Sequence, residues 1–505
     1  MGIVIRQSIK ASIVSYAGAV IGMVSTIFIY PYFLTPELIG LNRILVYSAF
    51  LFAFVAQIGI PNAIIRFSPQ LKKMGLIREA YRYALLLPII SFVFFGTLVF
   101  LGKDSLQGLF AENSPLFSKY FLLIIPFGLI CLYMGIIENF AVAYYRISIP
   151  KLIRDVFLRF LLIGSAILFF YLQLSIDLYV ILVIVSYAVA VIILFSYFKR
   201  LQRILTPQET RTGIPGEIVR SIFPYMGFVV LAGIGSSIVT KVDAFMISSM
   251  IGLGSTGIYT ISFFMSSIIE IPSKVTLQIS SPFVSESLEN NDIPRLKDLY
   301  VRYSANQAII GGLLFILLWA NVNSIFELMP DGDLYAAGKY VVLFIGLGKL
   351  IDVTTGINNL ILIYSKYYRY MILFVLTLGI ITISGNLILI PILGITGAAI
   401  ASLSSYFLFN TIVIIFIYRK LKIQPFTVKS LKIFLLIFLA FAINYFLPTL
   451  ENWFLDSLYR SLILLVIFVG FTYFYKLSED LNLLVLKGIG MLGLSRKNDE
   501  GIHNK

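Results

Sequence analysis

The sequence predicts an all-α polytopic membrane protein with about 14 transmembrane helices. Three observations lead to this fold class. About fourteen apolar segments, each long enough to cross a bilayer, follow one another through the chain. The short links between them alternate between rich and poor in Lys and Arg. The composition agrees, since 505 residues at 59% hydrophobic, 13% charged and mean hydropathy +0.94 lie far from the balance of a soluble chain.

Each apolar segment is expected to be a helix, because lipid offers no partner for a free backbone amide. A β-barrel would instead show short alternating strands. Several segments exceed the roughly 20 residues of a straight span, which indicates tilted or projecting helices. In chain order, the predicted spans are 8–33, 41–65, 82–102, 117–145, 152–173, 177–198, 219–249, 254–284, 299–326, 335–364, 369–391, 394–418, 431–448 and 459–476.

Basic residues set the predicted orientation. Most of the 39 Lys and Arg residues fall in links on one side, which we take to be cytoplasmic. Both termini are then cytoplasmic and the number of spans is even. The formal net charge of +14 needs no nucleic-acid partner, because cytoplasmic loops of membrane proteins carry such a surplus. The cations near the opposite side are Arg43, Lys103, Lys119, Lys339 and Arg460.

The links between the spans suggest two lobes. The largest link is rich in Pro, Gly and Thr and follows the sixth span. Six spans per lobe would make any internal repeat parallel, with its axis along the membrane normal. A weak echo between PELIGLNRILVYSAF and GSTGIYTISFFMSS favours such pseudo-symmetry. The predicted divisions are an N-terminal six-helix lobe at 1–204, a cytoplasmic linker at 205–218, a C-terminal six-helix lobe at 219–420, two additional transmembrane helices at 421–487 and a cytoplasmic tail at 488–505.

Several classes of chemistry are disfavoured. The lone Cys131 lies in an apolar run, so no disulfide is expected and its expected role is packing. The single histidine, His503, lies in the polar tail, which excludes a His-based metal site or catalytic triad within the membrane. The first apolar run is too long for a cleaved signal peptide and reads as a retained span. We expect no enzyme activity and no cofactor.

Charged residues inside spans are the strongest chemical clues, since each costs a few kcal/mol or more near the bilayer centre unless it is paired or faces water. Lys349 and Asp352, three residues apart, share a helix face and suit either an ion pair or a translocation path. Lys241 and Asp243 point to nearly opposite faces, so at least one should face a cavity or another helix. The remaining charged residues of the spans are Glu138, Glu270 and Arg43.

The roles of these last three stay open. Glu138 and Glu270 sit near predicted cytoplasmic span ends, where a carboxylate reaches water cheaply, and proton coupling is the alternative. Arg43 suits either snorkelling to the interface or exposure to a cavity, where its guanidinium would meet an anionic pyrophosphate.

Three stretches resemble a known family: GIPNAIIRFSP (59–69), KVDAFMISSMIGLGSTGIYTIS (241–262) and LILIPILGITGAAIAS (387–402). They are similar to the Wzx-type polysaccharide and O-antigen flippases of the multidrug/oligosaccharidyl-lipid/polysaccharide exporter superfamily. The resemblance implies two six-helix lobes around a cavity that opens alternately to either side of the bacterial inner membrane. It also implies transport of an undecaprenyl-pyrophosphate-linked oligosaccharide for O-antigen, lipopolysaccharide or capsule synthesis.

The resemblance carries over to individual residues. Arg66 matches the Arg of the family's Gly-x-x-x-(small)-x-x-Arg pattern, and Asp243 matches the acid of its Asp-x-Phe-Met-Ile pattern. The following position, often basic in relatives, is Ala244 here, while Lys241 lies two residues before the acid. The predicted pyrophosphate-binding cations are Arg43, Arg66, Lys241 and Lys349. The predicted residues for ion coupling or buried pairing are Asp243, Glu270, Asp352 and Glu138.

Partners and alternatives follow from this interpretation. The expected partners are the lipid-linked oligosaccharide, membrane lipids and polysaccharide polymerase or chain-length proteins, and coupling to H⁺ or Na⁺ stays open. An ion-coupled multidrug antiporter of the same superfamily would need acidic residues in the N-terminal cavity, yet the first three spans hold no interior Asp or Glu. A non-transporting scaffold would not need buried charges in both lobes. A net cationic cavity would favour the flippase.

Overall fold

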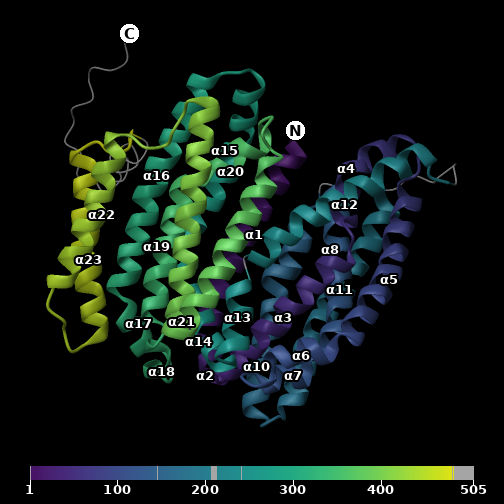
Figure 1. Ribbon diagram of the computed structural model, residues 1–505, viewed down its shortest axis with the longest axis horizontal. Helices are drawn as coiled ribbons and strands as arrows, with labels where there is room; N and C mark the ends of the chain where they lie inside the picture. Colours follow the sequence, from purple (N-terminus) through teal and green to yellow (C-terminus); the bar gives the residue numbers. More distant parts are fainter. Residues whose placement is uncertain (1, 145, 206–212, 240, 480–481, 483–505) are drawn as a thin grey trace. The chain divides into compact units, whose positions relative to one another are not determined.

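The computed structural model describes residues 2–144, 146–205, 213–239, 241–479 and 482 (Figure 1). The described chain is helical almost throughout and contains no strand, which confirms the predicted all-α class. The predicted tail at 488–505, with His503, lies outside the described residues, as do residues 206–212 of the predicted linker.

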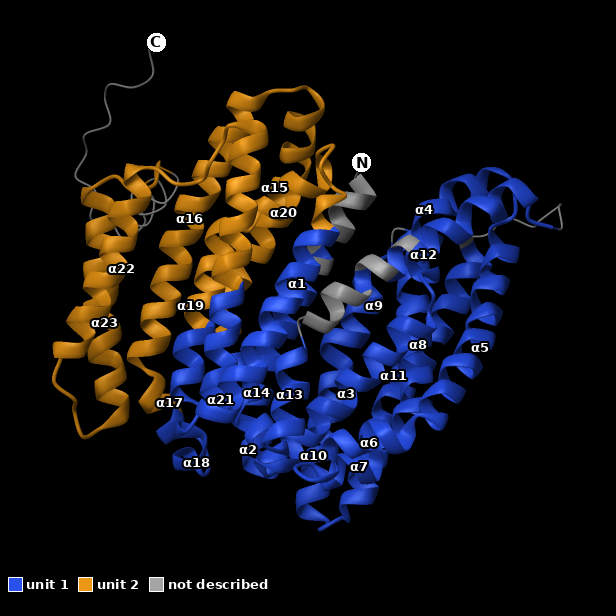
Figure 2. Cartoon of the chain, viewed as in Figure 1, with its two compact units in different colours: residues 1–265, 326–345, 372–405 blue, residues 266–325, 346–371, 406–505 orange. Residues whose placement is uncertain are grey.

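Two compact units make up the described chain (Figure 2). The first unit comprises 1–265, 326–345 and 372–405, and the second comprises 266–325, 346–371 and 406–505. Both units draw on separate stretches of sequence, whereas the predicted lobes are continuous stretches. The lobe boundaries at 204 and 420 therefore stay a prediction.

The first unit holds most of the N-terminal helices. Its core forms where α3 and α11 pack on α8 and where α1 packs on η3. Its elements are α1 (Gly2–Val24), the π-helix η1 (Ser25–Ile29), α2 (Tyr30–Phe33), α3 (Pro36–Ala56), α4 (Ile60–Lys73), α5 (Ile77–Leu101), α6 (Lys103–Ala111), α7 (Pro115–Tyr120), the 3₁₀ turn η2 (Phe121–Leu123), α8 (Ile124–Ala143), α9 (Ser148–Lys151), the π-helix η3 (Leu152–Phe157), α10 (Leu158–Tyr171), α11 (Ile176–Leu205), α12 (Gly216–Val239), α13 (Val242–Met250), α14 (Leu253–Ser266) and α18 (Gly332–Ala336).

The second unit is organised around α16, which packs against α15, α22 and α23. Three more helices, α17 (Val322–Leu328), α19 (Lys339–Thr355) and α21 (Tyr370–Leu421), contribute residues to both units, as does α14 through its last residue, Ser266. The remaining elements of the second unit are the 3₁₀ turn η4 (Ser267–Glu270), α15 (Ile271–Glu289), α16 (Ile293–Ala320), α20 (Ile357–Tyr364), α22 (Val428–Phe446) and α23 (Trp453–Phe474).

Short polar residues start several of these helices. Thr35 accepts a hydrogen bond from the backbone of Leu38 at the start of α3, and Asp292 caps α16 in the same way. Thr427 and Ser430 form a reciprocal capping box on α22. Asn452 accepts two backbone N–H groups at the start of α23. These caps satisfy amide groups that the first helical turn leaves free.

The second predicted span, 41–65, is not one helix. It breaks at Gln57–Gly59 into α3 and α4, and Gly59 has a left-handed φ of 77°. A Cβ atom at Gly59 would lie 2.7 Å from the carbonyl oxygen of Met226. Glycine is therefore needed here both for its backbone conformation and for the close approach of α12.

Other predicted spans also contain breaks. The span 335–364 divides into α19 and α20, which are bent by 46°. Conversely, the spans 369–391 and 394–418 are joined in α21, whose backbone is non-helical at Gly394. A straight helix of 52 residues would be about 78 Å long, far beyond one bilayer. The bend thus falls where the sequence predicted a boundary between two spans.

Within the described residues, nine helices are long and apolar enough to cross a membrane, or ten if the bent pair α19–α20 is one span. Two of these spans, Ile13–Phe33 and Pro115–Ala143, run through the π-helix η1 and the 3₁₀ turn η2. The chain is a multi-pass membrane protein, and the number of fourteen spans stays a prediction.

Arg460, predicted near the outer side, is held by an ion pair and by hydrogen bonds to backbone carbonyl groups. Its guanidinium pairs with Asp456 at 2.8 Å and donates to the carbonyl oxygens of Asn444, Leu447 and Pro448 at 3.0–3.1 Å. The side chain is 7% exposed. Arg460 thus ties the loop between α22 and α23 to the start of α23.

Candidate functional site

Three of the predicted site residues come together in the first unit. Arg43 on α3, Lys241 at the start of α13 and Asp243 two residues later line the same small hollow. Tyr47 lies beside both cations: its ring centroid is 4.0 Å from the Arg43 Cζ and 5.7 Å from the Lys241 Nζ. Phe264 covers Arg43 from another helix, at 4.7 Å. Aromatic faces stabilise both cations in this apolar setting.

Asp243 is held by three hydrogen-bond donors. Tyr259 donates at 2.7 Å and Ser402 at 2.5 Å to its Oδ2, and Asn386 donates at 2.7 Å to its Oδ1. These donors come from α14 and from both halves of α21 around Gly394. Among the described residues, the polar partners of Asp243 are these neutral groups and not the nearby Arg43 or Lys241. The carboxylate is therefore satisfied by neutral groups, while Arg43 and Lys241 keep their charge available.

Arg43 also lines a larger pocket of about 520 Å³ in the same unit. Two further guanidinium groups line it, those of Arg154 on η3 and Arg159 on α10. Hydroxyl and amide groups also line the pocket, from Ser25, Thr26, Tyr30, Asn42, Ser165, Tyr179, Tyr187 and Thr260. Of the acidic residues, only Asp155 lines the pocket among the described residues. The pocket is therefore net cationic.

The three arginines differ in their pairing. Arg154 donates to Glu138 at 2.8 Å and to Asp155 at 3.2 Å, so its charge is largely compensated. Neither Arg43 nor Arg159 forms an ion pair with any described carboxylate. A cation without a counter-ion in a pocket of a membrane protein is costly unless water or an anion reaches it. These two guanidinium groups are therefore candidate anion-binding groups.

A glycine on α1 makes room for Arg159. A Cβ atom at Gly22 would lie only 1.3 Å from the Arg159 Nη1. One turn earlier, a Cβ atom at Gly18 would lie 2.7 Å from the Asp155 Cβ. The spacing of four residues places both glycines on the face of α1 that packs on η3. The small residues let the helices approach closely and leave a slot for the guanidinium group.

Two π-helical turns, which lie far apart in the sequence, both line this pocket. Ser25 and Thr26 belong to η1, while Arg154 and Asp155 belong to η3. A π turn inserts an extra residue into the helix and re-aims side chains, and such turns are frequent at functional sites. Here they bring two hydroxyl groups and two charged groups into the same pocket wall.

A buried hydroxyl group supports a polar occupant. Thr260 on α14 is 4% exposed, and its Oγ1 has no hydrogen-bond partner among the described residues. The residue lines both the pocket and the hollow around Arg43. A buried hydroxyl group without a partner carries a free-energy cost, which a water molecule or a ligand oxygen would remove.

A second group of predicted residues lies in the other unit. Lys349 on α19 donates to Glu270 at the end of η4, and Lys274 also pairs with Glu270, at 3.2 Å. Lys349 is 2% exposed. The sequence spacing suggested Asp352 as a partner for Lys349. In the structure, Lys349 has a carboxylate partner on another element, Glu270 of η4. Asp352 accepts from Asn410 at 3.3 Å, and Asn410 itself accepts from Thr355 at 2.5 Å.

Arg66 lies apart from both groups. It is exposed on α4, and its Cζ is 4.3 Å from the ring centroid of Tyr225 on α12 and 5.7 Å from that of Phe67. It does not line the pocket of Arg43. Its role as a pyrophosphate-binding residue stays a prediction.

Sequence reasoning missed Arg154, Arg159 and Thr260. The two arginines had been counted with the basic cytoplasmic links because they begin the predicted span 152–173. The pair of glycines at 18 and 22 was the available signal for Arg159, but one sequence does not show which helix packs on them. No group of three or more His, Cys, Asp or Glu side chains suited to a metal ion occurs within the described residues.

The chain was compared with known proteins. No family model matches it, and no curated protein matches it in sequence. Solved structures do match in fold. A structure of the lipid II flippase MurJ in an inward closed conformation has a TM-score of 0.70 at 14% identity, covering 93% of this chain and 99% of that one.

Multidrug transporters share the fold as well. An inward-facing MATE family transporter of the MOP superfamily matches with a TM-score of 0.62 at 14% identity, over 81% of this chain and 98% of that one. A MATE structure in the straight conformation has a TM-score of 0.56 at 15% identity, over 83% and 96%. The chain therefore has the fold of these membrane transporters, and the similarity extends over most of its length.

Proposed function

We propose that this protein is a flippase that moves a polyprenyl-pyrophosphate-linked oligosaccharide across the bacterial inner membrane. The observation that carries the proposal is the cationic pocket, in which Arg43 and Arg159 lack a carboxylate partner among the described residues. A pyrophosphate carries several acceptor oxygens and negative charge, which the forked donors of arginine match.

The polar wall suits the rest of such a head group. Tyr179 and Asn42, which hydrogen-bond to each other, line the pocket together with Tyr30 and Thr260. Hydroxyl and amide groups can exchange hydrogen bonds with sugar hydroxyl groups, while tyrosine rings offer apolar faces. A polar pocket lowers the free-energy barrier for moving a polar head group through hydrocarbon. Such transport requires no covalent chemistry.

The similar fold of the lipid II flippase MurJ supports a lipid-linked substrate, and the net charge of the pocket supports an anionic one. The fold similarity to MATE transporters supports the alternative, an ion-coupled multidrug antiporter. A pocket for cationic drugs would need a surplus of carboxylates, whereas Asp155 is the one acidic residue among the described lining residues. We therefore prefer the flippase, of the Wzx type that the sequence motifs resemble.

Within this proposal, Arg43 and Arg159 bind the pyrophosphate, Lys241 adds charge beside Arg43, and Arg66 attracts the head group on the cytoplasmic side. We propose Asp243 as the ion-coupling group. Its carboxylate accepts hydrogen bonds from three neutral donors of the same unit, so binding of H⁺ or Na⁺ to the carboxylate would change these hydrogen bonds. Lys349 donates to Glu270, while Asp352 accepts from Asn410, and we propose that these three residues have a secondary role in transport.

The test is deletion of the gene followed by analysis of lipid-linked oligosaccharide in each leaflet. The flippase predicts accumulation on the cytoplasmic face and loss of surface polysaccharide. Complementation with Arg43→Gln or Arg159→Gln should fail at normal membrane levels of protein, whereas Arg203→Gln should restore flipping. Arg203 is the matched control because it is an exposed arginine of α11 that does not line the pocket. Unchanged glycan with increased sensitivity to cationic compounds would instead favour the antiporter.

A further inference from the structure

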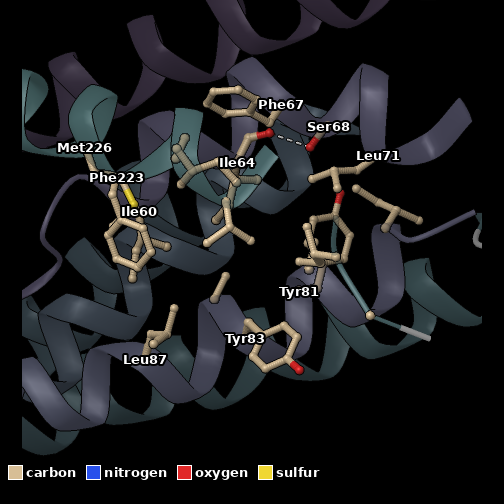
Figure 3. Close-up of a pocket in the computed structure, with 18 residues that line it drawn as sticks. Ile60, Ile64, Phe67, Ser68, Leu71, Tyr81, Tyr83, Leu87, Phe223 and Met226 are labelled. Atoms are coloured by element: carbon tan, nitrogen blue, oxygen red, sulfur yellow. Dashed lines mark hydrogen bonds between the residues drawn. The ribbon is translucent and has the colours of Figure 1, made fainter. Parts of the chain in front are cut away.

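A second pocket of about 370 Å³ lies in the first unit and is almost wholly apolar. Three helices build it. Figure 3 shows Ile60, Ile64 and Leu71 of α4, Tyr81 and Leu87 of α5, and Phe223 of α12 around the same space. On each helix the lining residues recur at intervals of three or four, so three apolar faces converge.

The pocket opens towards the surface of the unit. Tyr83 and Phe223, which line it, are 45% and 55% exposed. Inside it, Ala84 and Ile64 are 7% and 8% exposed. The only hydrogen bond drawn inside the pocket joins the Ser68 hydroxyl to the carbonyl oxygen of Ile64 within α4 (Figure 3). A deep apolar space with an exposed aromatic rim favours a hydrocarbon ligand over water.

Positive charges flank this apolar space. Arg82 lies between the lining residues Tyr81 and Tyr83, and Arg220 follows the lining residue Val219. Both arginines are exposed. Arg66 lies next to the lining residue Phe67 and stacks on Tyr225. The acidic residues on these elements are Glu79, which accepts from the backbone N–H of Gly213 at 2.7 Å, and Glu217.

We propose that this pocket, defined by α4, α5 and α12, binds one acyl chain of an anionic glycerophospholipid whose head group lies near Arg82 and Arg220. The charge of the flanking residues selects an anionic head group. The modest volume suits part of a single unbranched chain better than a long branched polyprenyl chain. The site is separate from the pocket of Arg43 and Arg159, so the inference does not rest on the flippase.

The experiment uses the purified full chain in detergent, stripped of lipid and titrated with palmitoyl-oleoyl phosphatidylglycerol or the matching phosphatidylcholine. Native mass spectrometry measures the lipid bound. We expect phosphatidylglycerol to bind more tightly than phosphatidylcholine. Ala84→Leu, which fills the pocket, should weaken both lipids. Gly164→Leu is the control for added bulk, because a Cβ atom at Gly164 meets nothing within 4 Å.

The charges are tested separately. Arg82→Gln and Arg220→Gln should each weaken phosphatidylglycerol by about fivefold, since a basic residue near an anionic surface contributes about 1 kcal/mol, and should leave phosphatidylcholine unchanged. Equal binding of phosphatidylglycerol by wild type and Ala84→Leu would overturn the proposal. So would stronger binding of a polyprenyl phosphate than of phosphatidylglycerol, because the occupant would then be the polyprenyl chain. Failure here would leave the flippase proposal untouched, since none of these variants alters its pocket.

Discussion

At the scale of single residues, the chain keeps arginines inside a membrane protein without giving each a carboxylate. Arg43 lies against Tyr47 and Phe264, so aromatic faces replace a counter-ion. Arg159 depends instead on the space that Gly22 leaves on α1. Such cations stay free to meet an anionic ligand. Arg154, by contrast, is compensated by Glu138 and Asp155.

The slot of Arg159 gives a matched pair of variants. Arg159→Gln removes a charged donor, and we expect binding of a polyprenyl pyrophosphate to weaken by about tenfold or more, since hydrogen bonds to charged groups contribute about 1.5–3 kcal/mol. Gly22→Val should have a similar effect because its side chain occupies the position of the guanidinium group. Binding is measured by native mass spectrometry against the uncharged polyprenol. Normal pyrophosphate binding by Gly22→Val would contradict the role of the slot.

Asp243 allows stability and coupling to be separated. Asp243→Ala leaves Tyr259, Asn386 and Ser402 without their shared acceptor, so we expect a loss of about 1–3 kcal/mol in stability per stranded buried group. Asp243→Asn keeps one acceptor oxygen and should remain better folded. The thermal midpoint in detergent measures both. If Asp243 is the coupling group, Asp243→Asn should also abolish the dependence of transport on the ion gradient, and retained dependence would count against it.

At the scale of elements, breaks in helices place the site. Two π turns, η1 and η3, aim Ser25, Thr26, Arg154 and Asp155 into one pocket. The bend of α21 at Gly394 lets Asn386 and Ser402, on either side of it, donate to the same carboxylate. Regular helices of this length could not bring these residues together.

Adding one methyl group at Gly59 tests whether the break between α3 and α4 requires glycine. Gly59→Ala places a Cβ atom 2.7 Å from the Met226 carbonyl oxygen in a left-handed conformation. We expect a loss of at least about 1–2 kcal/mol, because the left-handed conformation alone costs that much for other residues. Gly164→Ala, in the interior of α10 with open space around its Cβ, should be neutral or stabilising by up to about 1 kcal/mol. Thermal midpoints in detergent compare the two, and equal midpoints would argue against strain at Gly59.

At the scale of the whole molecule, the predicted topology has consequences for labelling. Cys131 is 1% exposed, so background reaction should be low. With cytoplasmic termini, Arg203→Cys on the last turn of α11 should react with a membrane-impermeant maleimide only after cells are opened. Lys103→Cys at the start of α6 should react in intact cells. The reverse pattern would show that the charge bias was read in the wrong direction.

The sequence by itself determined the all-α class and the multi-pass character, because a bilayer imposes length and polarity on every span. It also pointed to Arg43, Lys241 and Asp243, which the structure brings together. Only the tertiary structure decided that Glu270 pairs with Lys349, that Arg159 occupies a slot beside Gly22, and that α3 and α4 separate at Gly59. The reason is physical: spacing along a chain fixes which face a residue takes, but the partner on another helix follows from packing alone.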